Sequence, residues 1–150
     1  MRGVLLAAGL GTRLFPLTQR RAKAAIPFLN RPLIEYSLEM LRRAGVQEVA
    51  VNLHHLPETV KAALSADDAT LHYSFEEQIL GTAGAVGKLR RFLEGAPFVV
   101  CNAKIYFEQD LSEVLELHRF SDALATLVVA PPAPDSPFNQ IGRASCRERV

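Results

Sequence analysis

Short apolar runs alternate with longer amphipathic stretches along the first 130 residues of the chain. The run Val4–Ala7 is apolar at every position, which predicts a strand buried on both faces of a sheet. Similar patterns predict further strands at residues 48–52, 70–75, 98–101 and 125–130, and helices at residues 33–44, 57–65, 82–93 and 111–118. Pro32 at the start of the first helix and Gly45 after its end agree with the usual preferences at helix termini.

This alternation predicts a doubly wound α/β domain with a mostly parallel sheet. Helices between successive strands imply parallel pairing through right-handed crossovers. In such a sheet the ligand site lies at the carboxyl ends of the strands. Three loops follow strands directly, at residues 9–13, 76–81 and 102–104. We therefore expect these three loops to meet at one rim of the sheet.

The composition is that of an ordinary globular domain. The chain has 150 residues, of which 49% are hydrophobic and 22% charged, with a net charge of +1; this suits one domain. The near-neutral charge gives no support for nucleic-acid binding. No apolar run reaches the ~18 residues of a membrane span, and the N-terminus carries no secretory signal. We therefore expect a cytoplasmic protein with no nucleic-acid or membrane partner.

Several residues of chemically active types are assigned to structural roles. Cys101 and Cys146 do not make a disulfide framework, and Cys101 is predicted to be a small buried hydrophobe in an apolar strand. The histidines and cysteines show no zinc-ligand spacing. Arg42–Arg43 and Arg90–Arg91 are predicted to lie on solvated helix faces.

The end of the chain departs from this pattern. Residues 131–140 begin with a Pro-rich stretch and are predicted to be irregular. Residues 141–150, IGRASCRERV, have no helical or strand period and contain four arginines. This peptide is identical to the translation of a common sequencing adapter, so we expect it to be an artefact outside the fold. The alternative is a basic tail for an acidic partner.

The turn after the first strand is the strongest candidate for binding chemistry. Gly9 and Gly11 let the backbone approach a ligand where a Cβ would clash, and consecutive N–H groups in such a turn form an anion-binding nest. Arg13 adds a planar guanidinium suited to phosphate. The turn lacks the Lys-Ser/Thr ending of a P-loop and the third glycine of a dinucleotide fingerprint. These residues alone leave two alternatives, a polyphosphate loop and a simple strand-to-helix turn.

A longer pattern around this turn resembles the nucleotidyltransferase family that makes nucleotide sugars. It consists of GLGTRLFPLT at residues 9–18, KAAIP at residues 23–27 and RPLIEY at residues 31–36. The similarity is greatest to mannose-1-phosphate guanylyltransferases and N-acetylmuramate-1-phosphate uridylyltransferases. It implies that residues 1–130 are the nucleotide-binding part of a Rossmann-like domain that is incomplete at its C-terminus.

The resemblance implies a reaction of a nucleoside triphosphate (NTP) with a sugar 1-phosphate to give an NDP-sugar and pyrophosphate. Arg13 and Lys23 match the family's basic catalytic residues, which neutralise the leaving pyrophosphate. Ala24 stands where the family usually has proline. The nucleotide-binding residues that the resemblance implies are Leu6, Ala7, Ala8, Gly9, Gly11, Thr12, Arg13, Lys23, Gln78, Gly81, Thr82, Asn102 and Lys104.

The stretch EEQILGTAG at residues 76–84 resembles the family's base-binding loop. Gly81 permits close approach of the backbone to the nucleotide, and the helix that follows directs its positive end towards the site. A structural alternative is that Thr82 only caps this helix, and both roles are compatible. The base that is read does not follow from these residues.

Lys104 is the main departure from the family. The sequence NAK at residues 102–104 stands where the family has Asn-Gly-Asp, whose aspartate holds a catalytic Mg²⁺. An ammonium about 4 Å from a divalent cation costs on the order of 8 kcal/mol at an effective dielectric constant near 20. Three alternatives follow: Lys104 replaces the charge of the metal and holds a phosphate, Asp110 supplies a displaced carboxylate, or the site is degenerate. Asp110 is also a candidate N-cap of the next helix.

The resemblance therefore leaves more than one function open. The first is sugar-1-phosphate nucleotidyl transfer, with the fragment itself inactive because the sugar-binding half lies beyond residue 150. The second is a regulatory paralogue that binds a nucleotide or nucleotide sugar without transferring it, which Lys104 favours. A cytidylyl or guanylyl transferase acting on alcohol phosphates or molybdopterin is disfavoured by Pro16–Thr18. An unpaired apolar sheet edge would also make oligomerisation possible.

Overall fold

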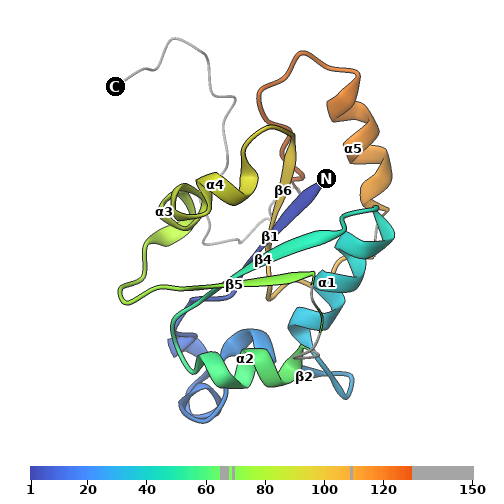
Figure 1. The fold of residues 1–150 in the computed structure, drawn as a ribbon. Helices are drawn as coiled ribbons and strands as arrows, with labels where there is room; N and C mark the ends of the chain where they lie inside the picture. The colour runs from blue at the N-terminus through green and yellow to red at the C-terminus, as the bar shows by residue number, and fades with distance from the viewer. Residues whose placement is uncertain (65–67, 69, 109, 130–150) are drawn as a thin grey trace.

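Four parallel strands form the centre of the computed structural model, which describes residues 1–64, 68, 70–108 and 110–129. The strands β1 (Arg2–Leu6), β4 (Glu48–Leu53), β5 (Leu71–Phe75) and β6 (Phe98–Asn102) lie in the order β5-β4-β1-β6 (Figure 1). A short antiparallel hairpin pairs β2 (Pro27–Phe28) with β3 (Arg31–Pro32). The strand order confirms the predicted doubly wound fold: β4 and β5 lie on one side of β1, and β6 lies on the other side.

Helices cover both faces of the sheet (Figure 1). One face carries α1 (Leu33–Arg43), α2 (Pro57–Ala63) and α5 (Leu111–Arg119). The other carries α3 (Gly81–Lys88) and α4 (Arg90–Leu93). Three short 3-10 helices, η1 (Thr12–Leu14), η2 (Leu17–Gln19) and η3 (Lys23–Ala25), lie between β1 and β2. The connection from β1 to β2 therefore consists of turns and short 3-10 helices, and it contains no α-helix.

The core follows the two-residue period of the strands. Leu5 and Val51 point towards α1 and α2, whereas Val4 and Ala50 point towards α3 and α4. All four side chains are fully buried. Burial of a valine or leucine side chain stabilises a protein by about 1.5–3 kcal/mol, so these strands are the main source of stability. The core cluster beneath α3 and α4 is the smaller of the two. Among the described residues, the buried side chains that pack there against Val4 and Ala50 are Leu89 and Leu93.

The predicted helix at residues 82–93 is in fact two helices. It is interrupted at Leu89, whose N–H is shared between the carbonyls of Ala85 and Val86. Gly84 and Gly87 lie just before the break, and glycine stabilises a helix less than alanine by about 1 kcal/mol. The weak helical propensity therefore allows the chain to turn between α3 and α4.

The predicted strand at residues 125–130 is wrong over residues 125–129, which form no strand. Leu127 and Val129 are 71% and 63% exposed, and no strand of the described residues pairs with them. An apolar run becomes a strand only when a neighbour accepts its backbone hydrogen bonds. Residues 130–150, which include the Pro-rich segment 131–140 and the suspected adapter peptide 141–150, lie outside the described residues, as does residue 65 of the predicted second helix.

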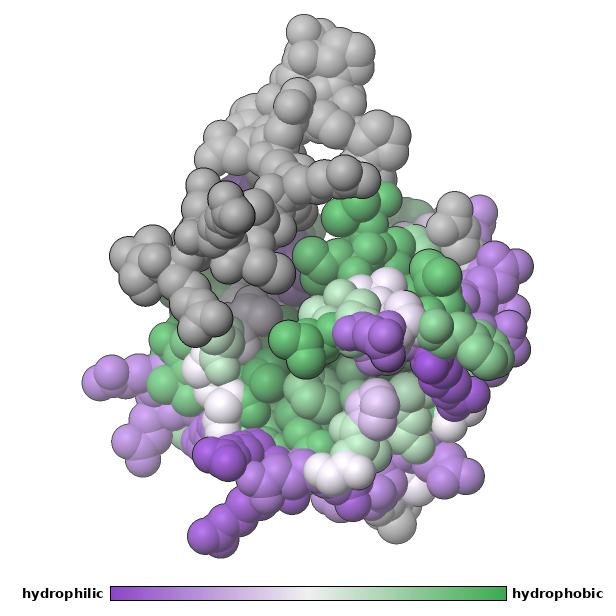
Figure 2. Space-filling view, turned by 90° about the horizontal axis from the view of Figure 1, so that it is seen from above, coloured by the Kyte–Doolittle hydropathy of each residue, from purple (hydrophilic) through white to green (hydrophobic). Residues whose placement is uncertain are grey.

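The outer edge of β6 is unpaired in the described part of the chain. Phe98 and Val100 of this strand are 41% and 39% exposed, and Phe120 after α5 is 90% exposed. Figure 2, which views the molecule of Figure 1 from above, shows a broad apolar area bordered by hydrophilic side chains. Exposed apolar edges of this kind are sites of further pairing or association.

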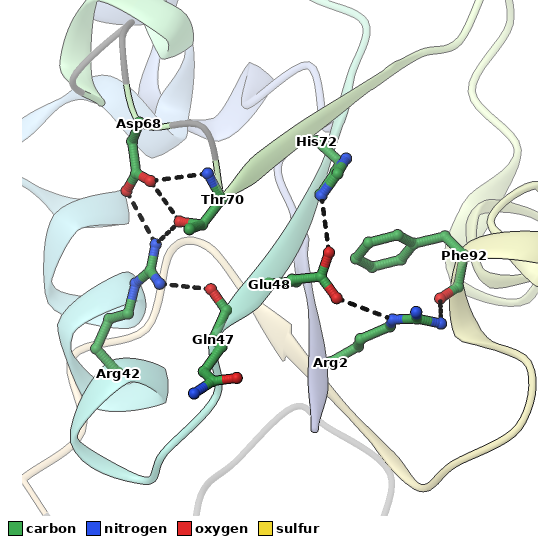
Figure 3. Close-up of polar contacts among 8 residues, drawn as sticks. All are labelled: Arg2, Arg42, Gln47, Glu48, Asp68, Thr70, His72 and Phe92. Atoms are coloured by element: carbon green, nitrogen blue, oxygen red, sulfur yellow. Dashed lines mark hydrogen bonds and ion pairs between the residues drawn. The ribbon is translucent and has the colours of Figure 1, made fainter.

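Polar side chains link the amino ends of the strands, at the edge opposite the predicted rim (Figure 3). Arg2 on β1 pairs with Glu48 on β4, which also contacts His72 on β5. The Arg2 guanidinium donates further to the carbonyl of Phe92. Hydrogen bonding to Arg2 holds the pKa of Glu48 below its usual value. These contacts fasten three strands at the end where no ligand is expected.

The prediction that Arg42 lies on a solvated helix face is wrong. Its guanidinium donates to the carboxylate of Asp68, to the hydroxyl of Thr70 and to the carbonyl of Gln47 (Figure 3). Hydrogen bonds from Thr70, and after them the charge of Arg42, lower the pKa of Asp68. Arg42 thus joins α1 to the chain that enters β5, which a helical charge pattern alone does not reveal.

Cys101 agrees with its predicted structural role. It lies on β6 and packs partly buried against the larger core cluster. Burial raises the pKa of its thiol to about 11, although a hydrogen bond with Ser37 acts in the opposite direction. The thiol therefore stays protonated at neutral pH and is a poor nucleophile.

Candidate functional site

A pocket of about 150 Å³ opens at the carboxyl ends of β1 and β6. These two strands are the neighbours at which the strand order reverses, where doubly wound folds bind their ligands. The pocket is lined by Leu6, Ala7, Gly9, Gly11, Thr12, Arg13, Lys23, Ala24 and Lys104. The predicted phosphate turn and the predicted loop after β6 therefore do meet at one rim.

Gly11 is the residue on which the shape of the turn depends. Its φ is +70°, and a Cβ here would lie 2.8 Å from Cγ2 of Thr18 and 3.1 Å from Cβ of Lys23. The fully buried Thr18 fixes the turn further, because its hydroxyl donates to the Gly11 carbonyl at 3.0 Å. Gly9 differs, since a Cβ there would meet nothing within 4 Å. The fold requires glycine at position 11, whereas Gly9 leaves room at the pocket.

The backbone of the turn has N–H groups that no described residue uses. Among the described residues, none accepts a hydrogen bond from the N–H groups of residues 8–11. The carbonyls of Gly11 and Thr12, in contrast, accept bonds from Leu14 and Phe15. Consecutive N–H groups without protein partners are typical of an anion-binding nest. The turn has the donors that a phosphate needs.

Three cationic side chains face the same pocket. They are Arg13 on η1, Lys23 at the start of η3 and Lys104 after β6. Burial, then the charges of Lys104 and Arg13, lower the pKa of Lys23. None of the three makes an ion pair or side-chain hydrogen bond with any residue that the structure describes. The pocket therefore concentrates positive charge that an anion would neutralise.

A buried polar link joins this turn to the loop after β5. The Ala7 N–H donates to Oδ1 of Asn52 at 2.7 Å, and Nδ2 of Asn52 donates to Oε1 of Glu76 at 2.8 Å. The other oxygen of Glu76 accepts the N–H of Leu80 at 3.0 Å, just before α3. Asn52 and Glu76 are 4% and 1% exposed. Two candidate ligand loops are thus held at a fixed separation by two side chains.

The sequence analysis did not assign a role to Asn52 or Glu76. Asn52 was placed only within a predicted strand, and Glu76 only within the loop that resembles the family's base-binding loop. The sequence signal that could have revealed the link was Asn52, a polar residue next to the end of the largely apolar strand Glu48–Leu53. A polar side chain at a position where the strand pattern demands burial needs a buried partner.

Several predicted binding residues do not line the pocket. Ala8 is buried beside it, and Asn102 lies opposite Leu6 in the strand register with its side chain exposed. Gln78, on the separate loop after β5, and Gly81 and Thr82, in the first turn of α3, are exposed. They lie near the same rim through the Asn52–Glu76 link, but the structure does not bring them into this pocket.

The suggested N-cap role of Thr82 is wrong, because α3 begins at Gly81 and the cap position is Leu80. The Glu76 carboxylate, which bonds the Leu80 N–H, serves this end of the helix instead. Asp110, by contrast, does cap α5, as its carboxylate accepts the N–H of Ser112 at 2.9 Å. That hydrogen bond lowers the pKa of Asp110.

Asp110 does not reach the cationic pocket. It lines another cavity, of about 490 Å³, together with residues of α1 and with Tyr106. No group of three His, Cys, Asp or Glu residues in the described ranges could hold a metal ion. The structure therefore gives Asp110 a capping role only.

The described part also contains no helix long and apolar enough to cross a membrane.

A parallel doubly wound sheet with a cationic pocket at its reversal point is typical of α/β proteins that bind phosphate-containing ligands. The family model described as nucleotidyl transferase matches residues 2–144. The chain belongs to the nucleotidyl transferase family, as its motifs predicted.

Two curated relatives show what the chain is similar to. It is 32% identical over 147 residues to a mannose-1-phosphate guanyltransferase of Debaryomyces hansenii, covering 94% of this chain and 41% of the relative. It is 34% identical over 142 residues to a UTP–glucose-1-phosphate uridylyltransferase of Synechocystis sp., covering 85% of this chain and 37% of the relative. The chain thus spans about two fifths of the length of these relatives.

A solved structure agrees with this fold. The chain superposes with a TM-score of 0.68 on HddC from Yersinia pseudotuberculosis, crystallised in complex with GMP-PN. The two share 27% identity, and the match covers 81% of this chain and 55% of HddC. The agreement confirms the predicted fold class and its incompleteness relative to such proteins.

The glycine turn yields a stability prediction with a matched control. We expect Gly11→Ala to destabilise the chain by about 1–3 kcal/mol, because alanine is strained at positive φ and its Cβ would overlap Thr18. Gly9→Ala should change stability by no more than about 0.5 kcal/mol. Urea unfolding measures both. An equal loss in the two variants would contradict the assignment of Gly11 as the structural glycine.

The Asn52–Glu76 link yields a second prediction. Asn52→Leu keeps the side-chain volume but leaves the Ala7 N–H and Oε1 of Glu76 without a buried partner. We expect a loss of about 2–4 kcal/mol in the free energy of unfolding. Asn102→Leu, at an exposed strand end, is the control and should cost about 0.5 kcal/mol or less. The link is unimportant if both variants unfold at the same urea concentration.

Proposed function

We propose that this chain is the NTP-binding part of a sugar-1-phosphate nucleotidyltransferase. The single observation that carries the proposal is the pocket at the sheet reversal, where Arg13, Lys23 and Lys104 meet a turn whose N–H groups have no partner among the described residues. A triphosphate is the natural ligand for such a combination of fixed donors and positive charge. The activities of the two curated relatives, both of which act on a sugar 1-phosphate, support this choice.

The proposed reaction joins an NTP and a sugar 1-phosphate into an NDP-sugar. An oxygen of the sugar phosphate attacks the α-phosphate of the NTP, the bond to the β-phosphate breaks, and pyrophosphate leaves. Arg13 and Lys23 are proposed to bind the departing pyrophosphate and to neutralise the charge that develops on it. The backbone from Ala8 to Thr12 positions the phosphates through its N–H groups.

The base is proposed to lie against the loop of residues 76–82. Gln78, Gly81 and Thr82 are exposed there, and Gly81 with its φ of +70° leaves space for close approach. The base itself stays unassigned, because one curated relative is a guanyltransferase and the other a uridylyltransferase. The sugar 1-phosphate would bind mainly through the part of the protein beyond this chain.

The family resemblance implies Mg²⁺, but the residues present do not fit it. Magnesium takes hard oxygen ligands such as carboxylates. The described residues that line the pocket include three cations and no carboxylate. Asp110, the other candidate, caps α5 and lines a different cavity. No step of the proposed reaction is therefore assigned to a metal held by these residues.

A second candidate function is a regulatory protein that binds the nucleotide without transferring it. Lys104 is the observation that favours it, because it stands where catalytic relatives have the metal-binding aspartate. The two functions differ in turnover by the full-length parent. Pyrophosphate release from an NTP and a sugar 1-phosphate supports the transferase, whereas nucleotide binding without release supports the regulator.

The shared part of both functions is tested by nucleotide binding to the chain. We expect Arg13→Met and Lys23→Met each to weaken binding of GTP or UTP by about ten- to a hundredfold, since each removes a charge-assisted contact to phosphate. Arg20→Met, an exposed arginine that does not line the pocket, should leave affinity within about twofold. Isothermal titration calorimetry measures the constants. Equal affinities for all three variants would rule out this pocket as the triphosphate site.

A further inference from the structure

We infer that Lys104 does the work of a divalent cation at this site, so that the pocket binds a triphosphate without any metal. The inference rests on the proposed function, because it names the way in which the same pocket compensates the charge of its ligand. It concerns this chain's own residues, and it departs from what the family resemblance implies.

The backbone around Lys104 is fixed on both sides. The N–H of the fully buried Ala103 donates to the carbonyl of Leu6, the last residue of β1, at 3.1 Å. On the other side, the hydroxyl of the buried Ser37 on α1 donates to the carbonyl of Ile105 at 3.1 Å. Lys104 therefore starts from a rigid point beside the glycine turn, while its own side chain is exposed at the pocket.

The charge around Lys104 is unbalanced in the absence of an anion. Lys104, Arg13 and Lys23 line the same pocket, and burial, followed by the charges of Lys104 and Arg13, lowers the pKa of Lys23. A lysine on a helix surface in this chain behaves differently, since Lys61 on α2 pairs with Glu58. Three neighbouring cations without a described counter-ion are the arrangement that a polyphosphate would stabilise.

No described carboxylate lines this pocket. Glu76 uses both oxygens for Asn52 and Leu80 within the buried link. Asp110 uses Oδ1 to cap α5 and lines the other cavity. A hard divalent cation would thus meet an ammonium in place of an oxygen ligand. Of the three alternatives that the sequence left open, the geometry favours the direct phosphate contact by Lys104.

The experiment measures binding of GTP, UTP and inorganic tripolyphosphate to the 150-residue chain, in excess EDTA and in excess Mg²⁺. We expect binding in EDTA to be at least as tight as in Mg²⁺. Lys104→Met should weaken binding in EDTA by about ten- to a hundredfold. Lys104→Asp should abolish binding in EDTA and recover it when Mg²⁺ is added. Lys61→Met, which removes the same charge from α2, should leave affinity within about twofold.

Each outcome decides the matter. Binding that requires Mg²⁺ in the unaltered chain overturns the inference and leaves the proposed function intact. No binding of any probe under either condition overturns both. Equal affinities of the unaltered chain and Lys104→Met in EDTA, or an equal loss in Lys61→Met, also overturn it. Thermal denaturation of each variant verifies folding, which the exposed side chain of Lys104 should not affect.

Discussion

Parallel pairing of β1 with β4 on one side and β6 on the other is the constraint on which the candidate site depends. In this register Leu6 lies opposite both Asn52 and Asn102, so three strands end at the same level. The glycine turn, the buried amide of Asn52 and the loop that carries Lys104 all follow from that common end. A shift of one residue in either pairing would reverse the faces of a strand and separate these groups.

The fold and the phosphate turn were largely predictable because both depend on local sequence. Apolar runs mark buried strands, and Gly11 with Arg13 marks a turn that approaches phosphate. The pairing of Asn52 with Glu76 was not predictable in this way, because it joins β4 to the residue just after β5, and the sequence does not state the register of these two strands. The strand at residues 125–130 was wrongly predicted for the same reason, since its apolar pattern says nothing about a partner.

The residues that line the site fit some parts of the family resemblance and not others. Arg13 and Lys23 were identified by the family pattern, and the structure brings them together with Lys104. The same pattern implied a metal, which the side chains of the described pocket do not accommodate. Asp110 was a reasonable substitute on sequence alone, because capping residues and metal ligands are the same residue type. Only the structure could decide between these two roles, because it shows Asp110 capping α5 and lining a different cavity.

The unequal size of the two core clusters has a consequence for motion. The cluster beneath α3 and α4 contains Val4, Ala50, Leu89 and Leu93, and the opposite face is packed more extensively. Segments with few buried apolar contacts open at a lower free energy than the rest of a domain. The proposed base-binding loop leads directly into α3, so this half of the proposed site rests on the layer with the smaller buried apolar cluster. The proposed phosphate-binding turn follows β1, which is paired on both sides in the centre of the sheet. We therefore expect the phosphate-binding half to open less readily than the proposed base-binding half.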